Sequence, residues 1–150
     1  MSQPCIDAEL CTVPLTAPRR VLIIDDDATL AAVLERGLRR HGFETLAATA
    51  GEPGLRLARK ERPALILLDI GLPDADGLAL CRQLVDDPMT ADIPVMILSG
   101  SDRPDVVRAA RAAGCHYFVR KPCDPSVLLV LAREAIDESQ WWDQSDALAG

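Results

Sequence analysis

Residues 21–27 have the sequence VLIIDDD, in which four apolar residues are followed directly by three aspartates. A short, continuously apolar run that ends in turn-forming residues is typical of a strand buried on both faces of a sheet. The runs ALILL (residues 64–68) and VMIL (residues 95–98) have the same character. The sequence therefore predicts a parallel sheet that is covered on both sides.

Segments with helical spacing separate the apolar runs. The clearest contains Leu30, Val33, Leu34 and Leu38, which recur at the period of one helix face, and Gly42 marks its expected end. Both faces of the predicted sheet can therefore be covered by amphipathic helices.

The rest of the chain continues this alternation. A second helix is expected up to about Lys60, a third from about Leu78 to Val85, a fourth after Asp102 and a fifth after Asp124. Strict alternation predicts right-handed crossovers between parallel strands, and so an α/β fold. The expected strands are residues 21–24, 43–48, 64–68, 95–98 and 116–119.

Length and composition indicate one domain. The chain has 150 residues, 49% of them hydrophobic, which is enough for a single core and too little for two ordinary domains. We expect a flexible leader at 1–18, an ordered domain at 19–138 and a C-terminal tail at 139–150. The tail contains Trp141 and Trp142, for which a docking contact and a helix end are equally compatible with the sequence.

Charge and cysteine content exclude several classes of function. The formal net charge of −7 argues against direct binding of nucleic acid, whose phosphates repel an acidic surface. The five cysteines are odd in number and form no CxxC pair, which favours a reducing cytoplasm over a disulfide framework or a zinc site. No stretch has the pattern of a signal peptide or a membrane span, so no membrane association is expected.

Polar residues follow the predicted strands at the point where each strand ends. Asp25 follows the first strand, Asp69 the third, Ser99 the fourth and Lys121 the fifth. The carboxyl ends of parallel strands share one edge of the sheet, where ligand sites form at a reversal of strand order. We therefore expect these four side chains at one site.

The carboxylates at this edge imply a divalent cation. Asp25, Asp26 and Asp69 would repel one another unless a cation lay between them, and an all-oxygen site suits Mg²⁺, with Mn²⁺ as a substitute. We assign Asp27 to capping the following helix instead. The histidines do not lie at the carboxyl ends of strands and are poorly placed as ligands.

This set of side chains also predicts phosphoryl chemistry. An aspartate carboxylate can attack phosphorus to form an acyl phosphate, and the transfer needs mainly alignment and stabilisation of charge on the transferred oxygens. The Lys121 ammonium and the Ser99 hydroxyl can contribute that stabilisation beside the cation. Asp69, Lys121 and Ser99 are therefore the expected catalytic residues.

Over roughly residues 19–138, the sequence resembles the receiver domains of two-component response regulators. The motifs occur in the order and with the spacing of that family, and the four together are specific. They are VLIIDDD at 21–27, LLDIGLPDADGL at 67–78, VMILSG at 95–100 and FVRKP at 118–122.

The resemblance implies a fold and a phosphorylation site. The expected fold is a flavodoxin-like (βα)5 three-layer sandwich with strand order 2-1-3-4-5. Asp69 would be the phosphoacceptor, and Asp25, Asp26 and the backbone carbonyl of Gly71 would join it in holding Mg²⁺. In the family, the side chain two positions after the acceptor tunes the phosphoryl lifetime, and here that position is Gly71, which has none.

The resemblance also implies a switch. Ser99 matches the hydroxyl that turns toward the phosphoryl group, and Lys121 matches the lysine that pairs with it, before a bond to Pro122 that is usually cis in the family. Phe118 matches the aromatic residue that moves inward when the hydroxyl moves. The expected output is a change of the face formed by the fourth helix, fifth strand and fifth helix.

The implied partners are proteins. The phosphoryl donor would be a histidine kinase or a histidine phosphotransfer protein that docks beside the first helix. The receiver of the signal would be a downstream protein or an output domain outside this sequence, and a homodimer could form through the switch face. The domain would thus be a signalling domain rather than an enzyme, although it assists its own phosphotransfer and dephosphorylation.

The sequence also bears on three other functions. A degenerate receiver would bind partners independently of phosphorylation, and a small Mg²⁺-dependent phosphohydrolase would use Asp69 as its nucleophile but lacks a cap segment and a general acid. A nucleotide-binding domain is disfavoured, because three aspartates follow the first strand where a phosphate-binding loop needs glycines.

Overall fold

The computed structural model describes the backbone of residues 19–101 and 103–149 and the side chains as far as Glu138. The leader expected at 1–18 lies outside the described residues. Strands and helices alternate along the described part of the chain. The strands are β2 (Arg20–Ile24), β3 (Glu44–Ala48), β4 (Leu65–Asp69), β5 (Val95–Ser99) and β6 (Tyr117–Arg120), and the helices are α1 (Ala28–Arg40), α2 (Gly51–Glu61), α3 (Gly77–Asp86), α4 (Pro104–Ala112) and α5 (Pro125–Ala149).

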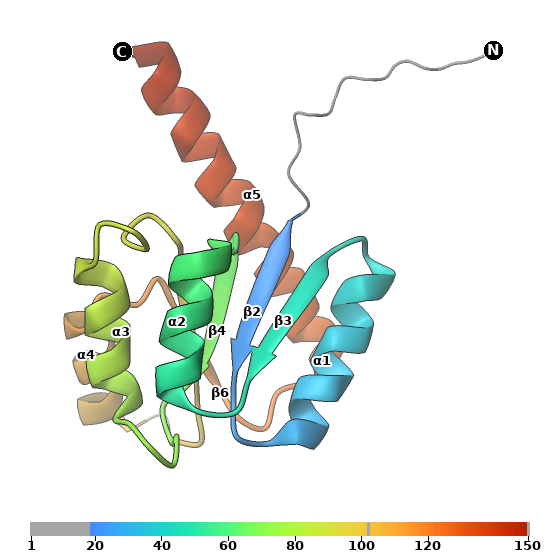
Figure 1. The fold of residues 1–150 in the computed structure, drawn as a ribbon, viewed down its shortest axis with the longest axis vertical. Helices are drawn as coiled ribbons and strands as arrows, with labels where there is room; N and C mark the ends of the chain where they lie inside the picture. Colours follow the sequence, from blue (N-terminus) through green and yellow to red (C-terminus); the bar gives the residue numbers. More distant parts are fainter. Residues whose placement is uncertain (1–18, 102, 150) are drawn as a thin grey trace.

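The strands form one parallel sheet in the order β3-β2-β4-β5-β6. In chain order this is 2-1-3-4-5, so the expected flavodoxin-like fold is confirmed. In Figure 1 the arrowheads of β2 and β3 both point toward the lower edge of the view, away from the end of α5, and parallel pairing places the carboxyl ends of the other strands at the same edge. The strand order reverses between β2 and β4, which places the first and third strands side by side.

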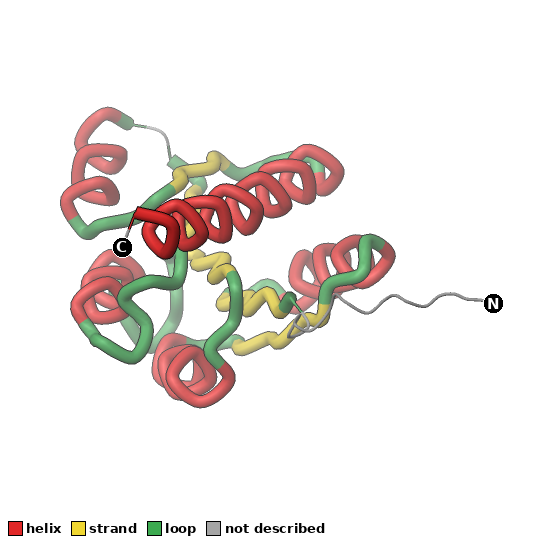
Figure 2. Tube along the Cα trace, turned by 90° about the horizontal axis from the view of Figure 1, so that it is seen from above, coloured by secondary structure: helices red, strands yellow, loops and turns green. Residues whose placement is uncertain are grey.

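Helices cover both faces of the sheet, and a separate core lies under each layer. One core cluster joins the sheet to α2, α3 and α4, and the other joins it to α1 and α5. Figure 2, seen from above, shows the strands running between these helices. The continuously apolar runs are explained by this arrangement, because every residue of Val21–Ile24 is fully buried.

Local signals in the sequence set several helix boundaries. Asp27 caps α1, with its side chain accepting hydrogen bonds from the backbone N–H groups of Thr29 and Leu30. Gly42 and Gly114, which follow α1 and α4, both have positive φ, a conformation that favours glycine. Pro104 occupies the first turn of α4.

Helix α5 is longer than the sequence analysis expected. The residues assigned to a tail from 139 onward continue the helix to Ala149. The sequence analysis gave the start of this helix, after Asp124, and placed the domain boundary at residue 138. No glycine or proline interrupts the chain from Ser126 to Ala149.

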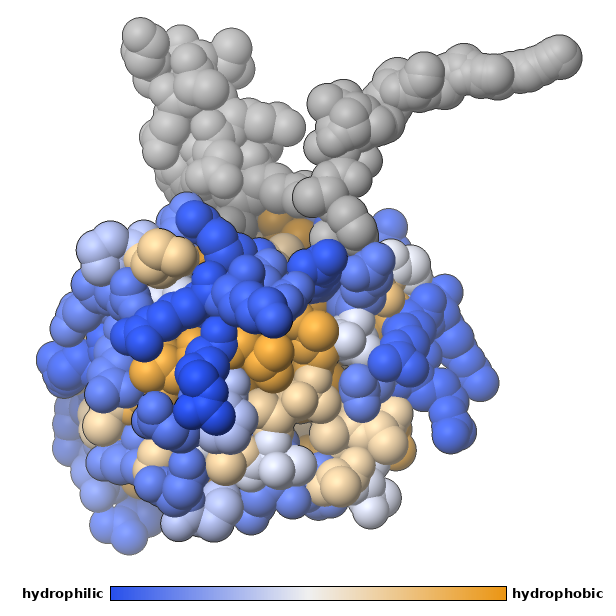
Figure 3. Space-filling view, in the orientation of Figure 1, coloured by the Kyte–Doolittle hydropathy of each residue, from blue (hydrophilic) through white to orange (hydrophobic). Residues whose placement is uncertain are grey.

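The surface in Figure 3 is largely hydrophilic, with a hydrophobic strip beside α2. Leu46 of β3 and Leu57 of α2 are partly buried and pack against the core cluster that contains α2. Within the described part of the chain, no helix combines the length and the apolar character needed to cross a bilayer.

Candidate phosphorylation site

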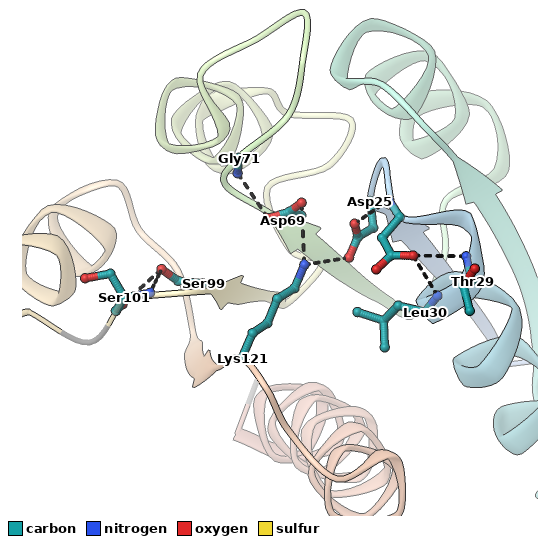
Figure 4. A network of polar contacts seen from close by, with 9 residues as sticks. Asp25, Thr29, Leu30, Asp69, Gly71, Ser99, Ser101 and Lys121 are labelled. Carbon is teal, nitrogen blue, oxygen red and sulfur yellow. Dashed lines mark hydrogen bonds and ion pairs between the residues drawn. The ribbon is translucent and has the colours of Figure 1, made fainter.

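The residues expected at the site come from the carboxyl ends of four strands. Asp25 follows β2, Asp69 ends β4, Ser99 ends β5 and Lys121 follows β6. Figure 4 shows the Lys121 side chain reaching toward Asp25 and Asp69. Parallel pairing of these strands places their ends at one edge, as the topology requires.

Lys121 bridges the two buried aspartates. Its Nζ lies 2.9 Å from Oδ2 of Asp25 and 3.5 Å from Oδ2 of Asp69. Burial disfavours the charged ammonium, but the hydrogen bond to Asp25 and the charges of both carboxylates outweigh it, and the pKa of Lys121 is raised. Lys121 is therefore held as a cation beside the expected phosphoacceptor.

The backbone holds the other oxygen of each aspartate. Oδ1 of Asp25 accepts a hydrogen bond of 2.9 Å from the N–H of Asp27, and Oδ1 of Asp69 accepts one of 3.0 Å from the N–H of Gly71. Asp25 is fully buried and Asp69 is nearly so. Both carboxylates are thus fixed from two sides, by Lys121 and by the chain.

The acidic residues fit a divalent cation. Asp25, Asp26 and Asp69 each offer a carboxylate oxygen, and the three oxygens lie within 4.8 Å of one another. Three hard oxygen donors at this spacing suit Mg²⁺ or Mn²⁺, and exposed Asp26 leaves the site open to water and ligand.

Ser99 is held away from this cluster. Its Oγ donates a 2.9 Å hydrogen bond to the carbonyl of Ser101 and accepts a 3.1 Å bond from the N–H of Ser101. Figure 4 shows this pair set apart from the Lys121 ammonium. Ser99 therefore shares the sheet edge with Asp69 but bonds to its own loop.

Phe118 lies on β6 opposite Ile97 of β5 and is partly buried against the core cluster that contains α4. Its side chain therefore lies on the face of the sheet that α2, α3 and α4 cover. The Lys121–Pro122 bond that follows β6 is cis, in agreement with the resemblance.

Neither histidine lies at the carboxyl end of a strand, as the sequence analysis expected. His41 caps the end of α1, and His116 precedes β6 and accepts a hydrogen bond from the N–H of Val95 through Nδ1. Burial lowers the pKa of His116, which favours this neutral, accepting form.

Sequence reasoning missed the contact of Asp74. Asp74 lies in the motif LLDIGLPDADGL at 67–78, and its carboxylate accepts hydrogen bonds from the N–H groups of Gly51 and Glu52 at the start of α2. These bonds lower the pKa of Asp74. No local spacing reveals this contact, because its partners are 22 and 23 residues away.

A cavity of about 350 Å³ adjoins the site between the start of α1 and the loop after β6. It is lined mainly by apolar side chains, together with Asp27 and Lys121. The lining residues are Asp27, Leu30, Leu98, Lys121, Pro122, Cys123 and Leu128.

Comparisons with known proteins point to one family. The family model described as response regulator receiver domain matches residues 21–133. Protein PilH of Pseudomonas aeruginosa is 36% identical over 110 residues, which are 73% of this chain and 91% of that protein. The transcriptional regulatory protein PrrA of Mycobacterium tuberculosis is 42% identical over 108 residues, or 72% of this chain but only 45% of that protein.

Solved structures agree with the sequence comparisons. A CheY-like response regulator receiver domain protein from Methanospirillum hungatei superposes with a TM-score of 0.77 at 27% identity, over 83% of this chain and 98% of that one. The receiver domain of a signal transduction histidine kinase from Syntrophus aciditrophicus gives a TM-score of 0.74 at 32% identity, over 80% and 91% of the two chains.

Proposed function

The chain belongs to the receiver domains of response regulators, and on this basis we propose that Asp69 accepts a phosphoryl group from a phosphohistidine. An oxygen of Asp69 attacks phosphorus, the phosphorus–nitrogen bond breaks, and the donor imidazole leaves. The observation that carries the proposal is the position of Lys121 Nζ, 2.9 Å from Asp25 and 3.5 Å from Asp69.

Each residue of the site has a part in the transfer. Lys121 holds a positive charge beside the oxygens of the incoming group, where it offsets the growing negative charge. Asp25, Asp26, Asp69 and the carbonyl of Gly71 would hold Mg²⁺, which when bound neutralises charge on carboxylate and phosphoryl oxygens. The N–H of Gly71 keeps Asp69 oriented through its Oδ1.

The proposed output begins at Ser99. Its hydroxyl bonds to the backbone of Ser101, and in the phosphorylated protein it would leave this partner for a phosphoryl oxygen. Phe118 would then move inward and change the face formed by α4, β6 and α5. A downstream protein, an output domain or a second copy of the chain would bind that face.

The proposed donor is a histidine kinase or a histidine phosphotransfer protein. The proposed approach of the donor is from the side of the cavity beside Lys121, which lies between the start of α1 and the loop after β6. A cytoplasmic location is proposed with it, and Cys81, Cys115 and Cys123 form no disulfide in the described part of the chain.

The test is the intact mass of the protein after treatment with acetyl phosphate, with and without Mg²⁺, for the parent and for Asp69→Asn. The proposal predicts one phosphoryl adduct that needs Mg²⁺, is cleaved by hydroxylamine and is lost in Asp69→Asn. A parent that binds Mg²⁺ but forms no adduct with any donor would instead be a phosphorylation-independent binding module. Repeated turnover of phosphomonoesters would indicate the phosphohydrolase.

A further inference from the structure

The loop between β4 and α3, residues 70–76, supports Asp69 directly. The N–H of Gly71 in this loop donates a 3.0 Å hydrogen bond to Oδ1 of Asp69. The position of one oxygen of Asp69 therefore depends on where the loop is held.

Asp74 fastens this loop to α2. Its Oδ1 accepts a 2.7 Å hydrogen bond from the N–H of Gly51, and its Oδ2 accepts a 3.2 Å bond from the N–H of Glu52. The N-cap residue of α2, Ala50, makes no side-chain capping bond. The loop thus supplies the cap that the helix lacks, and the helix in return anchors the loop.

The approach of the loop to α2 is close enough to require glycine. A Cβ at Gly51 would lie 2.8 Å from Cβ of Ala75 and 3.3 Å from Cδ2 of Leu80. Any side chain at position 51 would therefore push the β4–α3 loop away from the helix, even with Asp74 intact.

The far end of the loop is equally confined. A Cβ at Gly77 would lie 2.3 Å from Cα of Ile70 and 2.9 Å from the carbonyl oxygen of Asp69. The loop is therefore held at two places, where Gly77 packs against Asp69 and Ile70 and where Asp74 contacts α2. Gly71 lies between Ile70 and Asp74 in the chain.

We propose that Asp74 is a positioning residue for the metal site. By holding the β4–α3 loop against the start of α2, it keeps the Gly71 N–H on Asp69 and the Gly71 carbonyl at the cation. This inference rests on the proposed function, because it assumes that Mg²⁺ binds at Asp25, Asp26 and Asp69.

The test is calorimetric titration of Mg²⁺ into the parent and four variants. Asp74→Ala is expected to weaken Mg²⁺ binding on the order of tenfold, as the loss of a supporting contact around a metal site does. Asp74→Asn keeps one acceptor oxygen, so its Mg²⁺ affinity should lie between those of the parent and Asp74→Ala. Gly51→Ala keeps the negative charge of Asp74 but displaces the β4–α3 loop, so it should also weaken Mg²⁺ binding.

Asp87→Ala is the matched control. Asp87, which follows α3, also contacts α2, through a 2.6 Å ion pair with Arg59. Arg59 lies in the last turn of α2, at the opposite end of the helix from Gly51 and Glu52. Its removal deletes a negative charge and an inter-element contact, yet should leave Mg²⁺ affinity within about twofold of the parent.

A second readout separates positioning from loss of structure. The rate of adduct formation with acetyl phosphate is measured against Mg²⁺ concentration. In Asp74→Ala and Gly51→Ala, the half-saturating Mg²⁺ concentration should rise while the rate at saturation stays near that of the parent.

The outcomes separate this inference from the proposed function. If the parent binds Mg²⁺ and Asp74→Ala binds it no more weakly than Asp87→Ala does, Asp74 is only a helix cap and the inference is wrong. The same holds if Gly51→Ala binds like the parent. If the parent binds no Mg²⁺, the proposed metal site fails and the inference fails with it.

Discussion

The ammonium of Lys121 makes its shorter carboxylate contact with Asp25, at 2.9 Å, rather than with Asp69, at 3.5 Å. Asp25 is fully buried, so its charge would be costly without a partner. Lys121 therefore stabilises the acidic site before any phosphoryl group arrives, in addition to its proposed part in the transfer.

Replacement of Lys121 by methionine, which keeps much of the side-chain volume, should lower stability. The change leaves buried Asp25 without its cation, and the expected loss is about 2 kcal/mol of unfolding free energy in the absence of divalent ions. Urea unfolding at neutral pH measures it, and added Mg²⁺ should recover part of the loss. Equal stability of parent and Lys121→Met would contradict this role.

The adjacent aspartates Asp26 and Asp27 should respond differently to the same substitution. Asp26→Asn removes a proposed Mg²⁺ ligand and should abolish most of the rise in thermal midpoint that Mg²⁺ gives the parent. Asp27→Asn should change little, because asparagine also caps a helix through its side-chain oxygen. Equal Mg²⁺ responses of the two variants would remove the distinction between ligand and cap.

Phe118→Ala should uncouple the switch while leaving phosphorylation intact. In the parent, the phosphoryl mimic beryllofluoride should shift the backbone NMR signals of α4, and in Phe118→Ala that response should be much reduced. Val119→Ala is the control, because Val119 is the next residue of β6 and packs against the opposite core cluster. An undiminished response in Phe118→Ala would exclude Phe118 from the switch.

Phe118→Ala should also weaken partner discrimination. A partner that binds the phosphorylated parent more tightly than the free parent should bind both forms of the variant with equal affinity. A difference as large as that of the parent would again exclude Phe118.

The stability of the protein should fall when the pH drops below 6.5, in part through His116. Burial lowers the pKa of His116 from its usual 6.5, so below that pH the unfolded chain takes up a proton before the folded protein does. This contribution is fully present above pH 6.5 and is lost progressively on acidification. His116→Asn can still accept the hydrogen bond from Val95 and should flatten the dependence of stability on pH as the pH falls below 6.5. An equally steep fall in both proteins would assign the effect to other groups.

Much of the fold could be predicted from the sequence, because its signals are local. The apolar run Val21–Ile24 is buried on both faces, and Asp27 caps the following helix. The meeting of Asp25 and Lys121 was predictable as well, since parallel strands place their carboxyl ends at one edge.

Contacts between distant segments could not be predicted in the same way. The motif at 67–78, which contains Asp74, gives no sign that the carboxylate of this residue reaches α2. The preference of Lys121 for Asp25 over Asp69 also depends on side-chain placement at the sheet edge, which spacing does not encode. The continuation of α5 to Ala149 was not predicted either, because the apolar spacing used to recognise helices indicates a buried face and does not mark where a helix ends.

The central claim is that Asp69 is the phosphoacceptor, and the most direct measurement locates the phosphoryl group in the chain. The protein is treated with acetyl phosphate and Mg²⁺, the acyl phosphate is reduced with borohydride, and the modified residue is identified by peptide mass spectrometry. Our account predicts homoserine at position 69 and at no other aspartate, with none formed when Mg²⁺ is withheld. Homoserine at position 25 or 26, or unmodified Asp69 in a protein that carries the adduct, would contradict it.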